Sequence, residues 1–205
     1  MSYKIIVARY NEDINWLKDE MSNCIIYNKG DKLNIENEIM LKNVGRESDT
    51  YLYYIITNYD NLPDILVFTQ ARISDHVGDD DVNYLLKLKN DALHKKKSQD
   101  FIIHYQTDYN CCWDKEWNLR DGQYYLSESY KDNKKILFID WFKENIISDY
   151  PNPNYIYSKA LFAVKKELIL KNSIEYYKKL ILEVNHHSNP VEAHFFERSW
   201  YYIFH

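Results

Sequence analysis

An apolar run that ends abruptly in polar residues is the feature that most constrains the fold of this chain. The run Lys4–Ala8 is rich in β-branched residues, and the polar sequence Arg9–Asp13 follows it directly. An amphipathic segment comes next, with apolar residues at helical spacing at Ile14, Leu17 and Met21. This pattern is typical of a buried parallel strand that opens into a helix. Ligands in open α/β sheets bind where such strands end, so the polar cluster predicts a small-molecule site.

The rest of the chain continues the alternation of strands and helices. Strands are expected at residues 3–8, 24–27, 65–69, 135–139 and 155–164. Helices are expected after Asn11 as a cap, from near Ser48, after Asp79–Asp81, at 166–170, at 173–184 and after Asn189 and Pro190. Residues 31–42 are expected to be irregular, and residues 98–134 to form loops and short strands. No linker or internal repeat is evident, so we expect one α/β domain over residues 1–205, with a mostly parallel sheet flanked by helices.

Composition excludes several classes of protein. The net charge is −5, and the one dense basic run, His94–Lys97, is expected to be a solvated loop or helix end, so nucleic-acid binding is not expected. Three cysteines (Cys24, Cys111 and Cys112) are an odd number and do not form a disulfide framework. No apolar segment is long enough to span a membrane, and the first one is too short for a signal peptide. We therefore expect a soluble, cytoplasmic protein.

Several motifs carry a resemblance to a known family. They are Ala8–Asp13, Tyr27–Gly30, Asn43–Ser48 with Thr50–Leu52, Phe68–Gln70, and Phe196–Trp200. The chain resembles an uncharacterised family of short proteins found in fungi, bacteria and large viruses, which is similar to nucleotide-sugar glycosyltransferases of the GT-A type. The resemblance covers nearly the whole chain and implies a single Rossmann-like domain. For a viral source, it implies the host cytoplasm as the location.

The resemblance also implies a metal site, but the sequence departs from the usual motif. In GT-A enzymes a metal bridges the donor diphosphate to an Asp-x-Asp motif, whereas the strand at 65–69 leads here into Gln70 and Arg72. Those two residues would hold a sugar hydroxyl or a phosphate, or only make hydrogen bonds within a loop. Asp75 and His76 are the alternative ligands for Mn²⁺ or Mg²⁺, which prefer oxygen donors. Asp79–Asp81 also offers carboxylates, although such a run most often marks a charged helix start.

The polar cluster after the first strand is the expected nucleotide site. The resemblance places Arg9 and Tyr10 against the nucleotide, with the Tyr10 ring stacked on it. Asn11 and Asp13 would donate or accept hydrogen bonds at the base or ribose. The alternative interpretation is local, because Asn11 is also a good helix cap and acidic residues favour a helix start.

Two cationic residues are candidates for the donor diphosphate. Arg46 offers a planar fork for phosphate oxygens, and Lys29 offers a point charge. Gly45, before Arg46, indicates a close backbone approach or a positive φ. The alternatives are a lysine in a surface turn and an arginine paired with Glu47.

The last helix carries the expected catalytic pair. His194 and Glu197 are three residues apart and therefore lie on one helical face, beside a buried stripe. Glu197 would deprotonate an acceptor hydroxyl, and His194 would contact the diphosphate or a metal. The alternative is a surface network between Glu197 and Arg198 beside a half-buried histidine.

These expectations combine into one main function and two alternatives. We expect a glycosyltransferase that moves a sugar from a nucleotide-sugar donor to a hydroxyl acceptor on a glycan or protein. The acceptor side would include aromatic residues at Trp113, Trp117, Tyr124 and Tyr125. The alternatives are a non-catalytic nucleotide- or carbohydrate-binding module, and a metal-dependent phosphate-ester hydrolase that uses the carboxylates of Asp75–Asp81.

Overall fold

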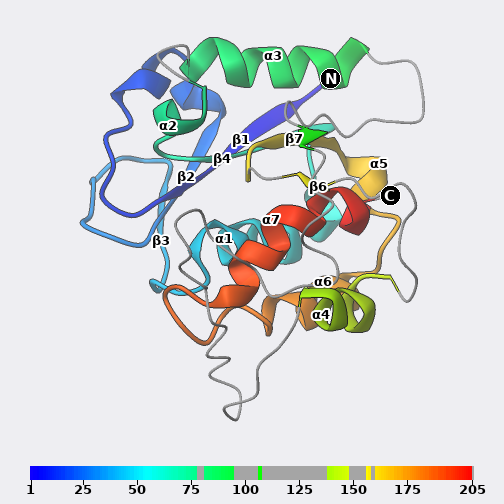
Figure 1. Cartoon of the computed structure of the whole chain (residues 1–205). Helices are drawn as coiled ribbons and strands as arrows, with labels where there is room; N and C mark the ends of the chain where they lie inside the picture. Colours follow the sequence, from blue (N-terminus) through cyan, green and yellow to red (C-terminus); the bar gives the residue numbers. More distant parts are fainter. Residues whose placement is uncertain (78–80, 95–105, 108–137, 148–155, 158–159, 205) are drawn as a thin grey trace.

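The computed structural model describes residues 1–77, 81–94, 106–107, 138–147, 156–157 and 160–204 (Figure 1). The strands are β1 (Tyr3–Arg9), β2 (Cys24–Asn28), β3 (Glu38–Met40), β4 (Ile65–Gln70), β5 (Gln106–Thr107), β6 (Ile156–Tyr157) and β7 (Phe162–Lys165). The α-helices are α1 (Arg46–Thr57), α2 (Ser74–Val77), α3 (Asp81–His94), α4 (Phe138–Asn145), α5 (Lys166–Ile169), α6 (Ile174–Ile181) and α7 (Val191–Phe204). Two 3₁₀ helices, η1 (Asn15–Asn23) and η2 (Tyr59–Asn61), complete the described elements.

The central sheet has the strand order β3-β2-β1-β4-β7. Strands β1 to β4 run parallel, and β7 joins β4 antiparallel at one edge. The register pairs Arg9 with Asn28 and Ala8 with Gln70, so the carboxyl ends of β1, β2 and β4 meet at one edge of the sheet. From β1 the chain moves outward to β3 and then crosses back to place β4 on the other side of β1. The expected α/β architecture with a mostly parallel, Rossmann-like sheet is confirmed.

The sheet is covered on both faces (Figure 1). Helices α1, α4, α6 and α7 lie on one face, and α3 lies on the other. This is why β1 is apolar without alternation: Ile5, Ile6 and Val7 are all at most 2% exposed. Ile6 packs into the core that contains α1 and α7, whereas Ile5 and Val7 pack into the core on the α3 side.

An aromatic cluster fixes α7 against α1 and the sheet. The ring of Tyr51 in α1 lies 4.8 Å from Phe68 in β4 and 5.8 Å from Trp200 in α7. Trp200 is in turn 5.4 Å from Phe162 in β7. The Tyr51 hydroxyl donates a hydrogen bond to the Ala160 carbonyl at 2.8 Å. Because these large side chains are fully buried, α1 and α7 have a fixed relative position.

The segment between β1 and β2 differs from its expected form. It is the 3₁₀ helix η1 rather than an α-helix, and its first flanking residue is Ile14 rather than Asn11. The Asn11 side chain instead accepts a hydrogen bond from the Asp31 backbone N–H at 2.7 Å. A 3₁₀ helix rises about 2.0 Å per residue against about 1.5 Å in an α-helix. The nine residues of η1 therefore cover more of the return path along the strands, and Leu17 still reaches the core.

Four other boundaries differ from the sequence expectations. Residues 31–42 were expected to be irregular but contain β3, a short edge strand with largely exposed side chains. Residues 135–139 were expected to form a strand. For the described part of this segment the prediction is wrong, because Phe138 begins helix α4. The buried residues of α4 are Phe138, Trp141 and Phe142, and they have the spacing of a helix. The expected strand at 155–164 is divided between β6 and β7, which belong to different sheets. Helix α1 begins at Arg46 rather than near Ser48.

Some sequence expectations fall outside the described residues. They concern Asp79 and Asp80, Lys95–Lys97, Cys111 and Cys112, the aromatic residues Trp113, Trp117, Tyr124 and Tyr125, and the segment 135–137. Among the helices that are described, none combines the length and apolar character needed to cross a lipid bilayer.

Candidate functional site

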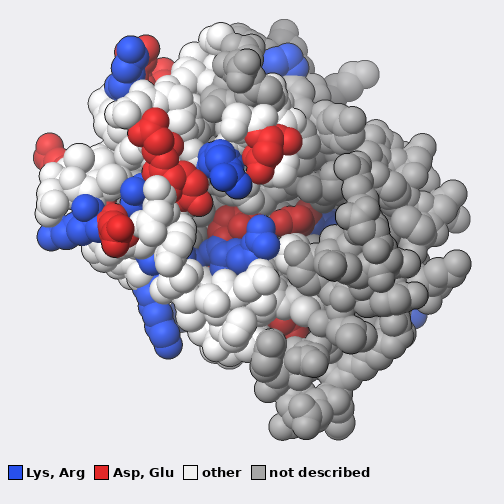
Figure 2. All heavy atoms as spheres, turned by 60° about the vertical axis from the view of Figure 1, so that its left-hand side comes forward, with Lys and Arg blue, Asp and Glu red and all other residues white. Residues whose placement is uncertain are grey.

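A cleft of about 360 Å³ opens at the carboxyl ends of β1 and β4. This is the point where the strand order reverses, and open α/β sheets bind ligands at such a point. Figure 2 shows charged side chains of both signs around this hollow. The residues that line it are Ala8, Arg9, Tyr10, Glu12, Lys29, Asn43, Arg46, Glu47, Gln70, Arg72, Asp75, His76, Ser188 and Glu197.

One wall of the cleft begins at a left-handed turn before α1. Gly45 has φ of 63° and Arg46 has φ of 50°, and the second value is costly for a residue with a side chain. The Gly45 N–H donates to the His187 carbonyl at 2.8 Å, which ties the turn to the loop before α7. A Cβ at Gly45 would lie 2.4 Å from the Asp49 Cβ and 2.9 Å from the Val184 carbonyl oxygen. Only glycine fits at this position, as the sequence indicated.

Lys29 fixes this turn through hydrogen bonds to its backbone carbonyl groups. Its side chain is 5% exposed, and its ammonium group donates to the Val44 carbonyl, to the Arg46 carbonyl at 2.6 Å and to Asp49 Oδ2 at 2.9 Å. Burial lowers the pKa of Lys29, and the charge of Asp49 opposes this shift. All three donors of the ammonium group are therefore used within the protein. Lys29 lines the cleft, but its hydrogen bonds serve to position Arg46.

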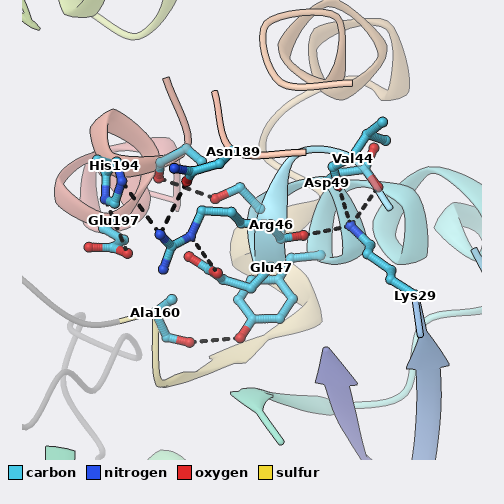
Figure 3. Close-up of polar contacts among 12 residues, drawn as sticks. Lys29, Val44, Arg46, Glu47, Asp49, Ala160, Asn189, His194 and Glu197 are labelled. Atoms are coloured by element: carbon cyan, nitrogen blue, oxygen red, sulfur yellow. Dashed lines mark hydrogen bonds and ion pairs between the residues drawn. The ribbon is translucent and has the colours of Figure 1, made fainter. Parts of the chain in front are cut away.

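The Arg46 guanidinium lies between α1 and α7 (Figure 3). Its Nη1 is 3.3 Å from Asn189 Oδ1 and 3.5 Å from His194 Nε2, and its Nε is 3.5 Å from Glu47 Oε2. These contacts are long for hydrogen bonds, and the side chain is 34% exposed. The guanidinium lines the cleft, and its planar fork of N–H donors suits an anionic ligand there.

His194 is neutral in this arrangement. Burial lowers its pKa to about 3, and the nearby charges of Arg46 and Arg198 add to this effect. Arg46 can only donate, so Nε2 of His194 acts as the acceptor and the proton resides on Nδ1. Nδ1 lies 3.9 Å from Glu197 Oε1, which confirms that His194 and Glu197 share one face of α7.

Glu197 and Glu47 form a carboxyl pair at the cleft. Glu47 is 6% exposed, the Glu197 side chain is 16% exposed, and both line the cleft. Burial and, after it, the negative charge of Glu47 raise the pKa of Glu197 to about 8, against the opposing positive charges of Arg46 and Arg198. Glu47 was considered in the sequence only as a partner of Arg46. Its contact with Glu197 joins the start of α1 to the middle of α7, which are far apart in the chain, and no local pattern indicates it.

The expected nucleotide residues after β1 have mixed positions. Arg9 and Tyr10 line the cleft, and Tyr10 is 50% exposed at its rim. Arg9 is buried and donates to the carbonyls of Glu12 at 2.9 Å and Asp31 at 3.0 Å, and to Asn28 Oδ1 at 2.8 Å. Its guanidinium therefore joins the loops that follow β1 and β2.

Asn11 and Asp13 do not line the main cleft. They lie at a neighbouring hollow of about 470 Å³, which also contains Met21 and Leu33. Asn11 bonds to the Asp31 backbone, and Asp13 Oδ1 accepts from the Asn15 N–H at 3.3 Å. The first strand end thus contributes residues to two adjacent hollows.

The opposite wall of the cleft consists of the residues after β4. Gln70, Arg72, Asp75 and His76 all line the cleft, as the sequence placed them. Arg72 and Asp75 side chains are 69% and 53% exposed, and their closest charged atoms are 3.8 Å apart. Asp75 lies 3.8 Å from His76. Within the described residues no three His, Cys, Asp or Glu side chains converge as a metal site requires. Asp75 and His76 would need further ligands, so no step of chemistry is assigned to a metal.

Comparison with known proteins gives one match. The model of a family described as "Protein of unknown function (DUF3431)" matches residues 5–205. Searches of curated proteins and of solved structures return no match to the chain.

Proposed function

The chain belongs to this family of unknown function, and from its cleft we propose that it is a nucleotide-sugar-dependent glycosyltransferase. The donor would bind at the carboxyl ends of β1 and β4, and the acceptor would be a hydroxyl group of a glycan or protein. The observation that carries the proposal is the meeting of Arg46 and Glu197 in one cleft at the reversal of strand order. The sequence resemblance to GT-A enzymes points in the same direction.

Arg46 is the group assigned to the donor diphosphate. It lines the cleft with 34% of its side chain exposed, and its planar fork of N–H donors matches the oxygens of a phosphate group. As the bond between the anomeric carbon and the phosphate oxygen breaks, the electron pair passes to the diphosphate. A fixed guanidinium beside that oxygen stabilises the developing charge without reorganisation. Arg72 on the opposite wall supplies a second, more exposed charge.

Glu197 is the group assigned to the acceptor. Its ionised carboxylate would take the proton of the acceptor hydroxyl while the acceptor oxygen bonds to the anomeric carbon. Proton transfer of this kind contributes roughly 10²- to 10⁴-fold in rate. Because the pKa of Glu197 is raised to about 8, we expect the rate to increase with pH through the neutral range.

Ligand-dependent thermal unfolding tests the donor site. The full chain is heated with UDP-, GDP-, CMP- and dTDP-sugars, each with and without Mn²⁺. A donor at 100 times its dissociation constant should stabilise the folded state by about 2.7 kcal/mol. Arg46→Gln should weaken binding roughly 10- to 100-fold, because a hydrogen bond to a charged group is lost. The control Lys18→Gln removes an exposed charge of η1 that does not line the cleft and should bind donor normally.

A second measurement separates transfer from binding. Release of nucleoside diphosphate in the presence of acceptor glycans supports the transferase. Stabilisation by a donor that is never consumed would instead favour a non-catalytic binding module. No stabilisation by any nucleotide sugar would contradict the proposed donor site and leave phosphate-ester hydrolysis as the function to test. The difference between the Mn²⁺ and metal-free measurements determines whether a divalent cation takes part.

A further inference from the structure

Beside Glu197, one buried oxygen atom of Glu47 has no hydrogen-bond donor among the described residues. Glu47 is almost fully buried, and its Oε2 is the oxygen that faces Arg46. Its other oxygen, Oε1, is inaccessible to solvent and receives no hydrogen bond from any described residue. A buried carboxylate oxygen without a donor destabilises the folded state, so such an atom calls for an explanation.

The neighbouring carboxyl supplies the missing donor. Glu197 lies within side-chain hydrogen-bonding reach of Glu47, and Figure 3 shows both carboxyl groups beside the Arg46 guanidinium. Two ionised carboxylates at this separation repel each other, and burial strengthens the repulsion. If one of them keeps a proton, the repulsion becomes a hydrogen bond from the protonated carboxyl to the other. Glu197 is the more accessible group and is the one that favours the protonated form.

We propose that Glu47 and Glu197 share a single proton at neutral pH, with Glu47 as the positioning residue that holds Glu197 as the proton-exchanging group of the cleft. The shared proton rests on the burial of both carboxyl groups in one cleft and on the Oε1 atom of Glu47 that lacks a donor. Its use in transfer to an acceptor hydroxyl rests on the proposed glycosyltransferase function. Neither the local sequence around Glu47 nor the family assignment gives this residue a role.

The other groups around the pair influence its protonation in both directions. Those facing it are Arg46 and Tyr51 on α1, His194 and Arg198 on α7, and Arg72, Asp75 and His76 across the cleft. His194 is neutral, and the Tyr51 hydroxyl donates to the Ala160 carbonyl. Arg46 and Arg198 favour ionisation of Glu197, but burial and the repulsion from Glu47 favour a retained proton and outweigh the two arginines.

NMR titration of the side-chain carboxyl carbons tests the shared proton directly, without substrate. In the wild-type protein the Glu197 signal, assigned by its absence from Glu197→Gln, should titrate above pH 7. In Glu47→Gln the negative neighbour is gone, and the titration should move down by at least about one pH unit. Glu36→Gln, which removes an exposed carboxyl of a distant loop, should leave the Glu197 titration unchanged. A wild-type Glu197 signal that titrates below pH 7, or that Glu47→Gln does not move, overturns the proposal.

A matched pair of variants provides a second test if Glu47→Gln does not fold. Glu197→Gln offers an amide N–H to Glu47 Oε1 and should keep its melting temperature at pH 7. Glu197→Leu fills similar space without a donor and should melt several degrees lower. Equal melting temperatures for the two variants would overturn the hydrogen bond between the carboxyl groups.

These results are independent of the proposed activity. A high Glu197 titration in a protein that consumes no nucleotide sugar supports the shared proton and contradicts glycosyl transfer. Donor consumption by a protein whose Glu197 titrates below pH 7 supports transfer and overturns the shared proton. Where both hold, Glu47→Gln should shift the rising limb of the pH profile of kcat/KM downward, whereas a merely structural role would lower the rate at all pH values equally.

Discussion

The two walls of the cleft are built in opposite ways. The wall made by α1 and α7 is tightly constrained: Lys29 and Asp49 are buried, Gly45 has no space for a side chain, and Glu47 faces Glu197. The wall after β4 carries Arg72 and Asp75, which are mostly exposed and interact at 3.8 Å. Precise placement of charge requires side chains fixed by their surroundings, whereas adaptable contact to a ligand does not.

This difference suggests a division of roles. The constrained wall contains a strained Arg46 backbone and a buried ion pair. Both features help to fix the positions of one guanidinium and one carboxyl pair. On the exposed wall, Arg72 can follow a bound ligand because little else holds it. Substitutions on the first wall should therefore change stability, and substitutions on the second should change binding alone.

The largest effect is expected for Lys29→Met. The substitution leaves the Asp49 carboxylate buried without its partner, and breaking such a pair costs about 3–5 kcal/mol. Urea unfolding of the purified variant measures the loss. Asp49→Asn in the same chain removes the unpaired charge, so the double variant should lose less than the sum of the two single variants. Additive losses would mean that the two residues act separately and that the turn is not held by their pairing.

The next effect is expected for Gly45→Ala. The new Cβ would approach Asp49 and Val184 at less than 3 Å, and φ of 63° is unfavourable for alanine, so we expect a loss of about 2–3 kcal/mol. Lys42→Ala, on the exposed segment before the turn, is the control and should change the unfolding free energy little. Gly45→Asn separates the two causes, because asparagine tolerates positive φ but meets the same neighbours. Similar losses in both variants would identify crowding as the main cost.

In the wall made by α1 and α7, the features that depend on local sequence pattern were predicted correctly. Glycine before Arg46 indicated a positive φ, and the spacing of His194 and Glu197 placed both on one face of α7. The parallel strands were predicted because burial on both faces leaves continuous apolar runs such as Ile5–Val7. The small strand β3 was missed because a three-residue edge strand with exposed side chains has no such signal.

Features that depend on long-range contacts could not be predicted from a single sequence. Glu47 meets Glu197 only because an aromatic cluster packs α7 against α1. Lys29 looked like an exposed turn residue, and its burial depends on the carbonyls of a distant turn. The predicted helix after Asn11 became η1 because tertiary contacts of the loop decided the form of the segment. Local propensity is a weak guide wherever such contacts compete with it.

A smaller, pH-dependent effect is expected for Glu197→Gln. The carboxyl has a pKa of 4.5 when unfolded and about 8 when folded. Below pH 4.5 it is protonated in both states, and between pH 4.5 and 8 only the unfolded chain releases the proton, so wild-type stability falls as pH rises. The variant lacks this loss, and its melting temperature relative to wild type should increase from pH 4.5 to pH 8. A constant difference across this range would show that Glu197 has an ordinary pKa.

His194→Asn should produce the opposite trend on the acidic side. The pKa of the imidazole is 6.5 when unfolded and about 3 when folded, so the unfolded chain takes up a proton first as pH falls. Wild-type stability is therefore lost between pH 6.5 and pH 3, and the variant should gain relative to wild type over that range. The same melting series detects both trends, because one appears on raising the pH and the other on lowering it.

The smallest effect on stability is expected for Arg72→Gln. Its side chain is 69% exposed, and an exposed ion pair contributes only about 0–1 kcal/mol, so urea unfolding should shift by no more than about 0.5 kcal/mol. Donor binding should nevertheless weaken, because a cationic group at the cleft is lost. A loss of stability comparable to that of Lys29→Met would contradict the contrast between the walls. An unchanged affinity for every donor that stabilises the wild type would restrict phosphate recognition to the Arg46 wall, where the guanidinium is held by α1 and α7.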